Sequence, residues 1–210
     1  MSERTAVVLA GGRSTRFGDE DKAVADLAGT PMIRRVVDRV SPTVDGVVVN
    51  CRSTQRGAIE SALAGAAVPV SFAEDEYPDE GPMAGMATGL RAVAGEYAFV
   101  VACDMPFVDP GFVEYLFERA AGHEAAVPRP EQWFETTHAV YRARAMADAC
   151  EAALEAGEKR IVAPLFDLDF VVVDAGEVRE HGAVHTFENC NTREDFEDAT
   201  RRLAEADESS

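Results

Sequence analysis

Short apolar segments alternate with helix-like repeats through residues 5–121, and no other feature limits the possible folds as strongly. Residues 5–9 are a short apolar run that leads into Gly11 and Gly12, as expected for a buried strand that ends in a glycine turn. After Pro31, residues 33–40 place apolar side chains at the spacing of an amphipathic helix. The alternation continues with predicted strands at 46–50, 68–73 and 97–103 and predicted helices at 54–64, 83–94 and 110–121.

Strands that alternate with helices need crossover connections, which place parallel strands side by side and cover both faces of the sheet with helices. We therefore predict a three-layer, doubly wound α/β fold with a mostly parallel sheet. Beyond residue 121 the pattern is mixed and leaves room for an antiparallel strand. Predicted strands there cover 125–128, 136–141 and 170–174, and predicted helices cover 143–156 and 192–206. Since no repeat or low-complexity linker interrupts the chain, we expect one domain over residues 1–210.

Charge and hydropathy narrow the function classes. The longest wholly apolar run, residues 97–103, is far shorter than the roughly 18 residues that a membrane-spanning helix needs. The net charge of −18 should repel phosphate backbones and anionic lipid, so we expect neither a nucleic-acid partner nor a membrane partner. No basic segment with a cleavage site precedes the first predicted strand, which favours a cytoplasmic protein.

The basic residues are almost all arginine, because Lys22 and Lys159 are the two lysines of the chain. A lysine-poor, acidic surface resembles that of halophilic proteins, which work in molar salt where the Debye length is about 3 Å. We therefore expect the protein to lose stability at low salt. We interpret the acidity as a solubility device that is separate from the chemistry of the site.

Cysteine and histidine spacing gives no sign of zinc. Cys51, Cys103, Cys150 and Cys190 form no CxxC pair, and the histidines form no HExxH motif. Small buried thiols are the better interpretation of the four cysteines.

The loop after the first predicted strand carries the strongest chemical signal. Gly11, Gly12 and Gly18 allow a sharp turn whose backbone amides can approach an anion, while Arg16 and Lys22 bring positive charge to the same place. This combination predicts a polyphosphate site at the carboxyl end of a strand, where open α/β sheets bind ligands. The loop has neither the Walker A sequence nor the GxGxxG spacing of a dinucleotide site.

Asp104 follows the predicted strand at 97–103, so it should face the glycine loop across the sheet. A carboxylate in this position suits Mg²⁺, which usually takes one or two carboxylates together with substrate phosphates. Alone, Asp104 would more readily be read as a helix or turn cap. Together with a phosphate loop, it predicts a metal ligand.

Six segments in order along the chain resemble the molybdenum cofactor guanylyltransferases, which belong to a wider group of nucleotidyltransferases with a Rossmann-like fold. These are Leu9-Ala10-Gly11-Gly12, Arg16-Phe17-Gly18, Asp21-Lys22, Gly81-Pro82-Met83-Ala84-Gly85-Met86, Cys103-Asp104-Met105-Pro106 and Asn189-Cys190-Asn191-Thr192. The resemblance implies transfer of GMP from GTP to the terminal phosphate of molybdopterin, with release of pyrophosphate. It also implies transient contact with molybdoenzymes or their chaperones.

The resemblance assigns roles by position within a nucleotide-binding half, residues 1–121. Backbone groups of Leu9, Ala10, Gly11 and Gly12 would contact the nucleotide, Asn50 and Asp75 would hold the guanosine, and Asp104 would hold Mg²⁺. Arg16, Lys22 and Asp104 would be catalytic, because charge must be offset when one phosphate attacks another. A carboxylate such as Asp75 can accept hydrogen bonds from the guanine edge or from ribose. Taken alone, Asn50 and Asp75 are typical of turns.

The resemblance places the acceptor in residues 122–210, with Arg160, Asn189 and Asn191 near the molybdopterin phosphate. Gly157-Glu158-Lys159-Arg160 is similar to a basic segment of the family, although a charge cluster at a helix end explains it equally well. His138 departs from the family pattern, in which His-Pro-Thr is common, and this leaves the acceptor less certain than the nucleotide.

Three other functions remain open. One is a CTP-dependent molybdopterin cytidylyltransferase, although the Gly11-Gly12 pair disfavours it. Another is a guanylyltransferase for a different phosphorylated acceptor, such as a cobinamide or lactate phosphate. The third is a nucleotide-binding module without catalysis, which the joint presence of Lys22 and Asp104 argues against.

Overall fold

The computed structural model describes residues 3–12, 21–75, 81–181 and 183–208, with side chains described to residue 205. Its main sheet has seven strands in the order β5-β4-β1-β6-β8-β7-β9. The strands are β1 (Arg4–Leu9), β4 (Gly46–Cys51), β5 (Val70–Glu74), β6 (Tyr97–Ala102), β7 (Ala125–Arg129), β8 (His138–Arg142) and β9 (Phe170–Asp174). The helices are α1 (Met32–Val40), α2 (Ser53–Ala62), α3 (Pro82–Arg91), α4 (Pro110–Ala120), α5 (Ala143–Glu155), α6 (Ala175–Glu180) and α7 (Arg193–Glu208). Single 3-10 turns are η1 (Lys22–Val24), η2 (Ser41–Thr43), η3 (Ala163–Asp167) and η4 (Val184–Phe187).

The sheet is mostly parallel, which confirms the predicted fold class. Strand β8 is antiparallel to both of its neighbours, β6 and β7, while the other pairs in the sheet are parallel. Six strands therefore end at the same edge of the sheet. The antiparallel strand lies in the half of the chain whose sequence pattern is mixed.

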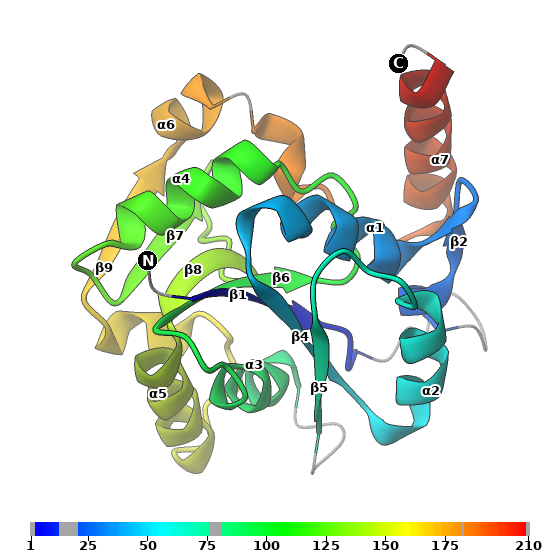
Figure 1. The fold of residues 1–210 in the computed structure, drawn as a ribbon. Coiled ribbons are helices and arrows are strands. Elements are labelled where there is room, and N and C mark those ends of the chain that lie inside the picture. The colour runs from blue at the N-terminus through cyan, green and yellow to red at the C-terminus, as the bar shows by residue number, and fades with distance from the viewer. Residues whose placement is uncertain (1–2, 13–20, 76–80, 182, 209–210) are drawn as a thin grey trace.

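Helices cover both faces of the sheet (Figure 1). Apolar side chains of α1, α2, α4 and α6 pack with one face in a single cluster. Those of α3 and α5 pack with the other face in a second cluster. Gly89 of α3 allows close packing, because a Cβ atom there would lie 2.5 Å from Cγ1 of Val7 in β1.

Helix α7 stands apart from the sheet, beside the small hairpin of β2 (Asp26–Leu27) and β3 (Thr30–Pro31) (Figure 1). A third apolar cluster joins them, in which Leu27 and Met32 pack against Ala199 and Leu203. The sequence pattern missed this hairpin, because strands of two residues are too short to show a period. It also missed the short helix α6. The hairpin turn requires Ala28 at φ 52° and Gly29 at φ 78°.

Two smaller predictions are also tested by the structure. The four cysteines are free thiols, and three of them, Cys51, Cys150 and Cys190, are buried. Within the described part of the chain, none of the helices combines the length and the apolar character needed to cross a bilayer.

Candidate functional site

The ends of β1, β4 and β6 build the centre of the site, because these strands are aligned in register. Leu9 pairs with Asn50 in β4 and with Ala102 in β6. The pairing continues past the strand end, since the amide of Ala10 donates to the Asn50 carbonyl at 2.8 Å and the amide of Cys103 donates to the Leu9 carbonyl at 3.0 Å. Parallel register alone thus places the start of the glycine loop between Asn50 and Asp104.

Three distant segments meet beside this centre in a cluster of Lys22, Asp104 and Asn191. Nζ of Lys22 lies 2.7 Å from Oδ2 of Asp104 and 2.9 Å from Oδ1 of Asn191. The Lys22 and Asp104 side chains are only 13% and 17% exposed, so their charges are partly shielded from water. The amide of Cys190 donates to the Asp104 carbonyl at 2.9 Å, which fixes Asn191 next to β6. The structure confirms the prediction that Lys22, at the end of the first loop, lies close to Asp104.

Asp104 has an oxygen atom that fits a metal ion. Its Oδ2 accepts from Lys22, but its Oδ1 is buried and has no hydrogen-bond partner among the described residues. A buried carboxylate oxygen without a partner costs free energy that a divalent cation would offset. Among the described residues, no group of three or more metal-binding side chains occurs. The donor set therefore fits Mg²⁺ held by one carboxylate together with water and substrate phosphates, the arrangement that Mg²⁺ commonly takes.

Asn50 and Asp75 lie on the other side of the glycine loop. Asn50 is 1% exposed, and its Nδ2 donates to Oδ1 of Asp75 at 2.6 Å and to the Ala73 carbonyl at 3.2 Å. Burial raises the pKa of the Asp75 carboxyl, and the hydrogen bond from Asn50 opposes that rise. The pair forms a small, fixed set of hydrogen-bonding groups at the ends of β4 and β5.

Two glycines leave room for this pair. A Cβ atom on Gly11 would lie 2.6 Å from Oδ2 of Asp75, and one on Gly85 would lie 2.4 Å from Oδ1 of Asn50. By contrast, a Cβ atom on Gly12 would meet no atom of the described residues within 4 Å. The two glycines of the loop therefore have different structural requirements, which their adjacency in the sequence hides.

Gln55 holds the two ends of the first loop, and sequence reasoning missed it. This α2 residue is 4% exposed, and its Nε2 donates to the Ala10 carbonyl at 3.0 Å and to Oδ2 of Asp21 at 2.8 Å. Asp21 in turn caps η1 through the amide of Ala23, so Lys22 begins a fixed turn. An isolated glutamine in an amphipathic helix gives no sequence signal. Its burial between two loop ends is visible only in the fold.

The predicted acceptor residues are only partly brought together. Asn191 joins Lys22, whereas Nδ2 of Asn189 donates to the Phe187 carbonyl at 3.2 Å. Arg160 lies after α5, is 76% exposed and pairs with Glu158 at 2.7 Å. Its hydrogen bonds hold the pKa of Glu158 down at about 2. Arg16, which was predicted to be catalytic, lies outside the described residues.

His138, which the sequence marks only as a departure from the family pattern, anchors the segment that leads to Asn191. It is fully buried at the start of β8, and burial lowers its pKa to about 3, so the ring is neutral. The Thr186 hydroxyl accepts from the amide of Asp109 at 2.9 Å and lies 3.2 Å from Nε2 of His138. The ring of Phe187 packs edge-on against the histidine at 5.0 Å. These contacts anchor η4, which leads directly to Asn191.

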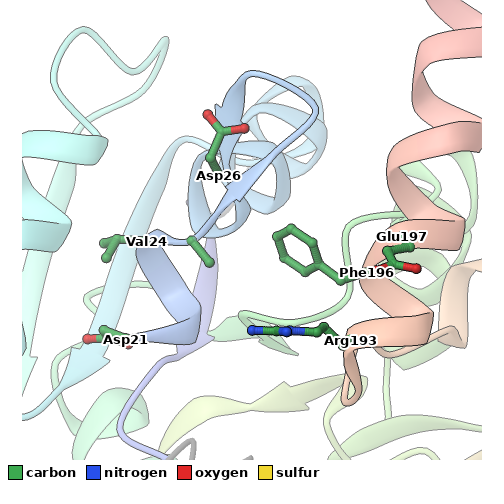
Figure 2. A pocket seen from close by; sticks show the side chains of 7 residues that line it. Asp21, Val24, Asp26, Arg193, Phe196 and Glu197 are labelled. Carbon is green, nitrogen blue, oxygen red and sulfur yellow. The ribbon is translucent and has the colours of Figure 1, made fainter. Parts of the chain in front are cut away.

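A pocket of about 630 Å³ lies between the η1–β2 segment and the first turns of α7. Figure 2 shows Arg193 and Phe196 projecting from α7 toward η1, with Asp26 and Glu197 at the sides. Both walls are continuations of the segments that meet at Lys22 and Asn191. The pocket therefore lies next to the cluster of Lys22, Asp104 and Asn191.

Comparison with known proteins finds relatives that match most of the chain. The family model for a MobA-like NTP transferase domain matches residues 6–169. A probable molybdenum cofactor guanylyltransferase of Natronomonas pharaonis is 53% identical, with 97% of this chain and 100% of that protein covered. Another of the same name, from Haloferax mediterranei, is 40% identical over 92% of this chain and 91% of its own length. The crystal structure of molybdopterin-guanine dinucleotide biosynthesis protein A from Archaeoglobus fulgidus superposes with a TM-score of 0.79 at 29% identity, covering 96% of this chain and 99% of that one.

Proposed function

Since this chain belongs to the MobA-like NTP transferase family, we propose that it transfers GMP from GTP to the terminal phosphate of molybdopterin. The products are molybdopterin guanine dinucleotide and pyrophosphate. The observation that carries the proposal is the meeting of Lys22, Asp104 and Asn191 from three distant segments at the carboxyl edge of the sheet. A binding module would not need a partly buried lysine and carboxylate in contact at this point.

The nucleotide would lie over the ends of β1 and β4. Backbone groups from Leu9 to Gly12 would contact it, and the side-chain oxygens of Asp75 and Asn50 would accept hydrogen bonds from the guanosine, because both N–H groups of Asn50 already donate within the chain. Because Gly11 and Gly85 have no side chain, the backbone can pass close to the oxygens of this pair. The triphosphate would then extend toward Lys22 and Asp104.

The reaction needs positioning and charge compensation more than covalent help from the protein. An oxygen of the acceptor phosphate attacks the α-phosphorus of GTP. A new P–O bond forms there while the bond to the β-phosphate oxygen breaks, and pyrophosphate leaves with the electron pair. Lys22 supplies positive charge, and we propose the same for Arg16. Phosphate oxygens are already ionised at neutral pH, so no side chain has to remove a proton.

Asp104 would hold Mg²⁺ through its unpartnered Oδ1. The ion, when bound, supplies positive charge to the phosphates. The remaining oxygen of Asp104 keeps Lys22 in place at 2.7 Å.

On the acceptor side, Asn191 would bind the molybdopterin phosphate from its position beside Lys22. Asn189 and Arg160 are further proposed acceptor residues. To reach a phosphate, Arg160 would have to leave Glu158, with which it now pairs. Because the pair is exposed, that exchange would cost little.

The decisive experiment offers the protein each nucleoside triphosphate in turn, with Mg²⁺ and molybdopterin, in about molar KCl that screens the acidic surface. Pyrophosphate release and the mass of the pterin product are measured. We expect product with GTP, increased in mass by GMP. Product with CTP in its place would contradict the base assignment. Binding of GTP without pyrophosphate release would contradict catalysis.

A further inference from the structure

We propose that the pocket between η1–β2 and α7 binds the pterin ring system of the acceptor (Figure 2). The inference rests on the proposed function and adds to it a location for the part of the acceptor that does not react. Its evidence is the position of the pocket, the chemistry of its walls and its size.

The pocket lies directly beside the cluster of Lys22, Asp104 and Asn191. Asp21 is the chain neighbour of Lys22, and Arg193 follows Asn191 by two positions. The contact between Lys22 and Asn191 therefore ties together the two segments that form opposite walls. A ligand whose phosphate lay against Lys22 and Asn191 could place its remaining atoms between those walls without crossing the nucleotide.

The wall that α7 provides is held rigidly relative to Asn191. Oδ2 of Asp195 accepts from the amides of Asn191 and Thr192 at 2.8 and 2.7 Å, and the Thr192 hydroxyl accepts from the amide of Asp195 at 3.1 Å. These reciprocal bonds cap the start of the helix. Arg193 and Phe196 therefore leave the helix from fixed positions, as a binding wall requires.

The walls match a planar heterocycle with amino groups on its edge. Phe196 contributes an aromatic ring to the wall, and Val24 and Ala25 provide apolar surface from η1–β2. The Glu197 carboxylate can accept hydrogen bonds from ring N–H and amino groups, as a 2-amino-4-oxo pterin presents them, whereas Oδ1 of Asp26 accepts from the amide of Gly29 at 2.8 Å. Arg193 can donate to the ring carbonyl.

The charge of the pocket argues against a phosphate chain. Among the described residues, the pocket is lined by three acidic residues, Asp21, Asp26 and Glu197, and by one basic residue, Arg193. The carboxylates of Asp21 and Asp26 are hydrogen-bonded within the chain, to Gln55 and to the amide of Gly29, and still contribute negative charge to this region. This surplus of negative charge repels a triphosphate, whereas a neutral ring suffers no such repulsion. The two substrates would therefore bind in different places. The triphosphate of GTP would lie near the positive charge of Lys22, and the pterin would lie in the acidic pocket.

The size agrees with this assignment. At about 630 Å³, the pocket lies inside the range of roughly 300–1,000 Å³ that is usual for small-molecule sites. It is far larger than a single phosphate or metal ion needs.

The test is a fluorescence titration of the full chain with a 6-substituted pterin that carries no phosphate. Stacking and hydrogen bonding should quench the pterin emission on binding. We expect Glu197→Gln and Arg193→Ala to weaken binding by about tenfold each, the effect of losing one hydrogen bond to a charged group. Phe196→Leu should weaken it while keeping apolar volume next to Leu27 and Met32.

Glu194→Gln is the matched control, because it removes the same charge from the same turn of α7 at a residue that does not line the pocket. It should leave pterin binding within about twofold of wild type. Equal binding by wild type and by both Glu197→Gln and Arg193→Ala would overturn the pocket assignment.

Turnover with GTP and molybdopterin separates this inference from the proposed function. If the function is right, Glu197→Gln should raise the KM for molybdopterin and leave the KM for GTP unchanged. Wild-type turnover with an unchanged molybdopterin KM in Glu197→Gln would refute the pocket alone. Absence of any product from wild type would refute the function, while the pterin titration would still decide the pocket.

Discussion

The two halves of the molecule position their site residues in different ways. In the first half, Leu9, Asn50 and Ala102 share one register across β1, β4 and β6, so parallel pairing alone sets the site. In the second half, Asn191 follows a 3-10 turn that is held by side chains, chiefly Thr186 against His138. In the first half, the regular strand pairing positions the residues proposed to bind the nucleotide. In the second half, the position of the residues proposed to bind the acceptor depends on a few buried polar contacts.

The largest effect should come from the point where the halves meet. Asp104→Asn keeps the shape but removes the charge that holds Lys22, and Lys22→Ala removes the cation. Each should lower turnover by roughly 10²–10³-fold, the cost of losing one aimed electrostatic contact. Steady-state pyrophosphate release measures this. Lys159→Ala, at the other lysine of the chain, is the matched control and should leave turnover near wild type. Full turnover in Asp104→Asn would remove that residue from the reaction.

A second prediction separates the two loop glycines within the first half. Gly11→Ala should raise the KM for GTP by about 10–100-fold, because its Cβ would collide with Oδ2 of Asp75 at 2.6 Å and overpacking costs roughly 1–3 kcal/mol. Gly12→Ala would bring its Cβ within 4 Å of no atom in the described part of the chain and should change the KM little. Equal KM values for the two variants would show that the close approach of Gly11 to Asp75 does not matter for nucleotide binding.

These glycines also show how far sequence reasoning reaches. Leu9, Asn50 and Asp104 could be predicted as neighbours, because parallel strands end at one edge. The different roles of Gly11 and Gly12 could not, since they depend on where Asp75 points. The roles of Gln55 and His138 could not be predicted for the same reason, because the roles of buried polar residues depend on partners that are 34 to 48 positions away.

The hairpin of β2 and β3 and the pocket beside it were beyond prediction as well. Two-residue strands carry no period, and their turn depends on the left-handed backbone of Ala28 and Gly29. By contrast, the mixed pattern after residue 121 did point to the half that contains the antiparallel strand β8. The spacing of apolar residues thus predicts regular helices and strands, whereas it does not predict contacts between distant segments.

A third prediction tests the polar anchor of the second half. His138 has a folded pKa of about 3, below the usual value near 6.5, so the unfolded chain binds its proton first as the pH falls. This group therefore lowers the free energy of unfolding as the pH falls from about 6.5 to 3, and the loss stops growing below about pH 3, where the folded ring is protonated too. From pH 7 to pH 5 the loss should be about 2 kcal/mol. Urea unfolding at both pH values measures it, and His138→Gln should lack this part of the pH dependence. An identical pH dependence in the variant would contradict a neutral buried ring.

The smallest effect should distinguish the two acceptor-side residues. Asn191→Ala should raise the KM for molybdopterin by about tenfold, because it removes a hydrogen-bonding group next to Lys22. Arg160→Ala should raise it by only about threefold, since this exposed side chain must first leave Glu158. The reverse order would mean that the acceptor phosphate lies near the loop after α5 and away from Lys22.

A crystal structure of the protein with bound GTP tests the central claim most directly. We predict a phosphate oxygen within about 3.2 Å of Nζ of Lys22, with the guanosine against Asn50 and Asp75. Triphosphate density remote from Lys22 and Asp104, with the base bound elsewhere on the sheet, would contradict the account.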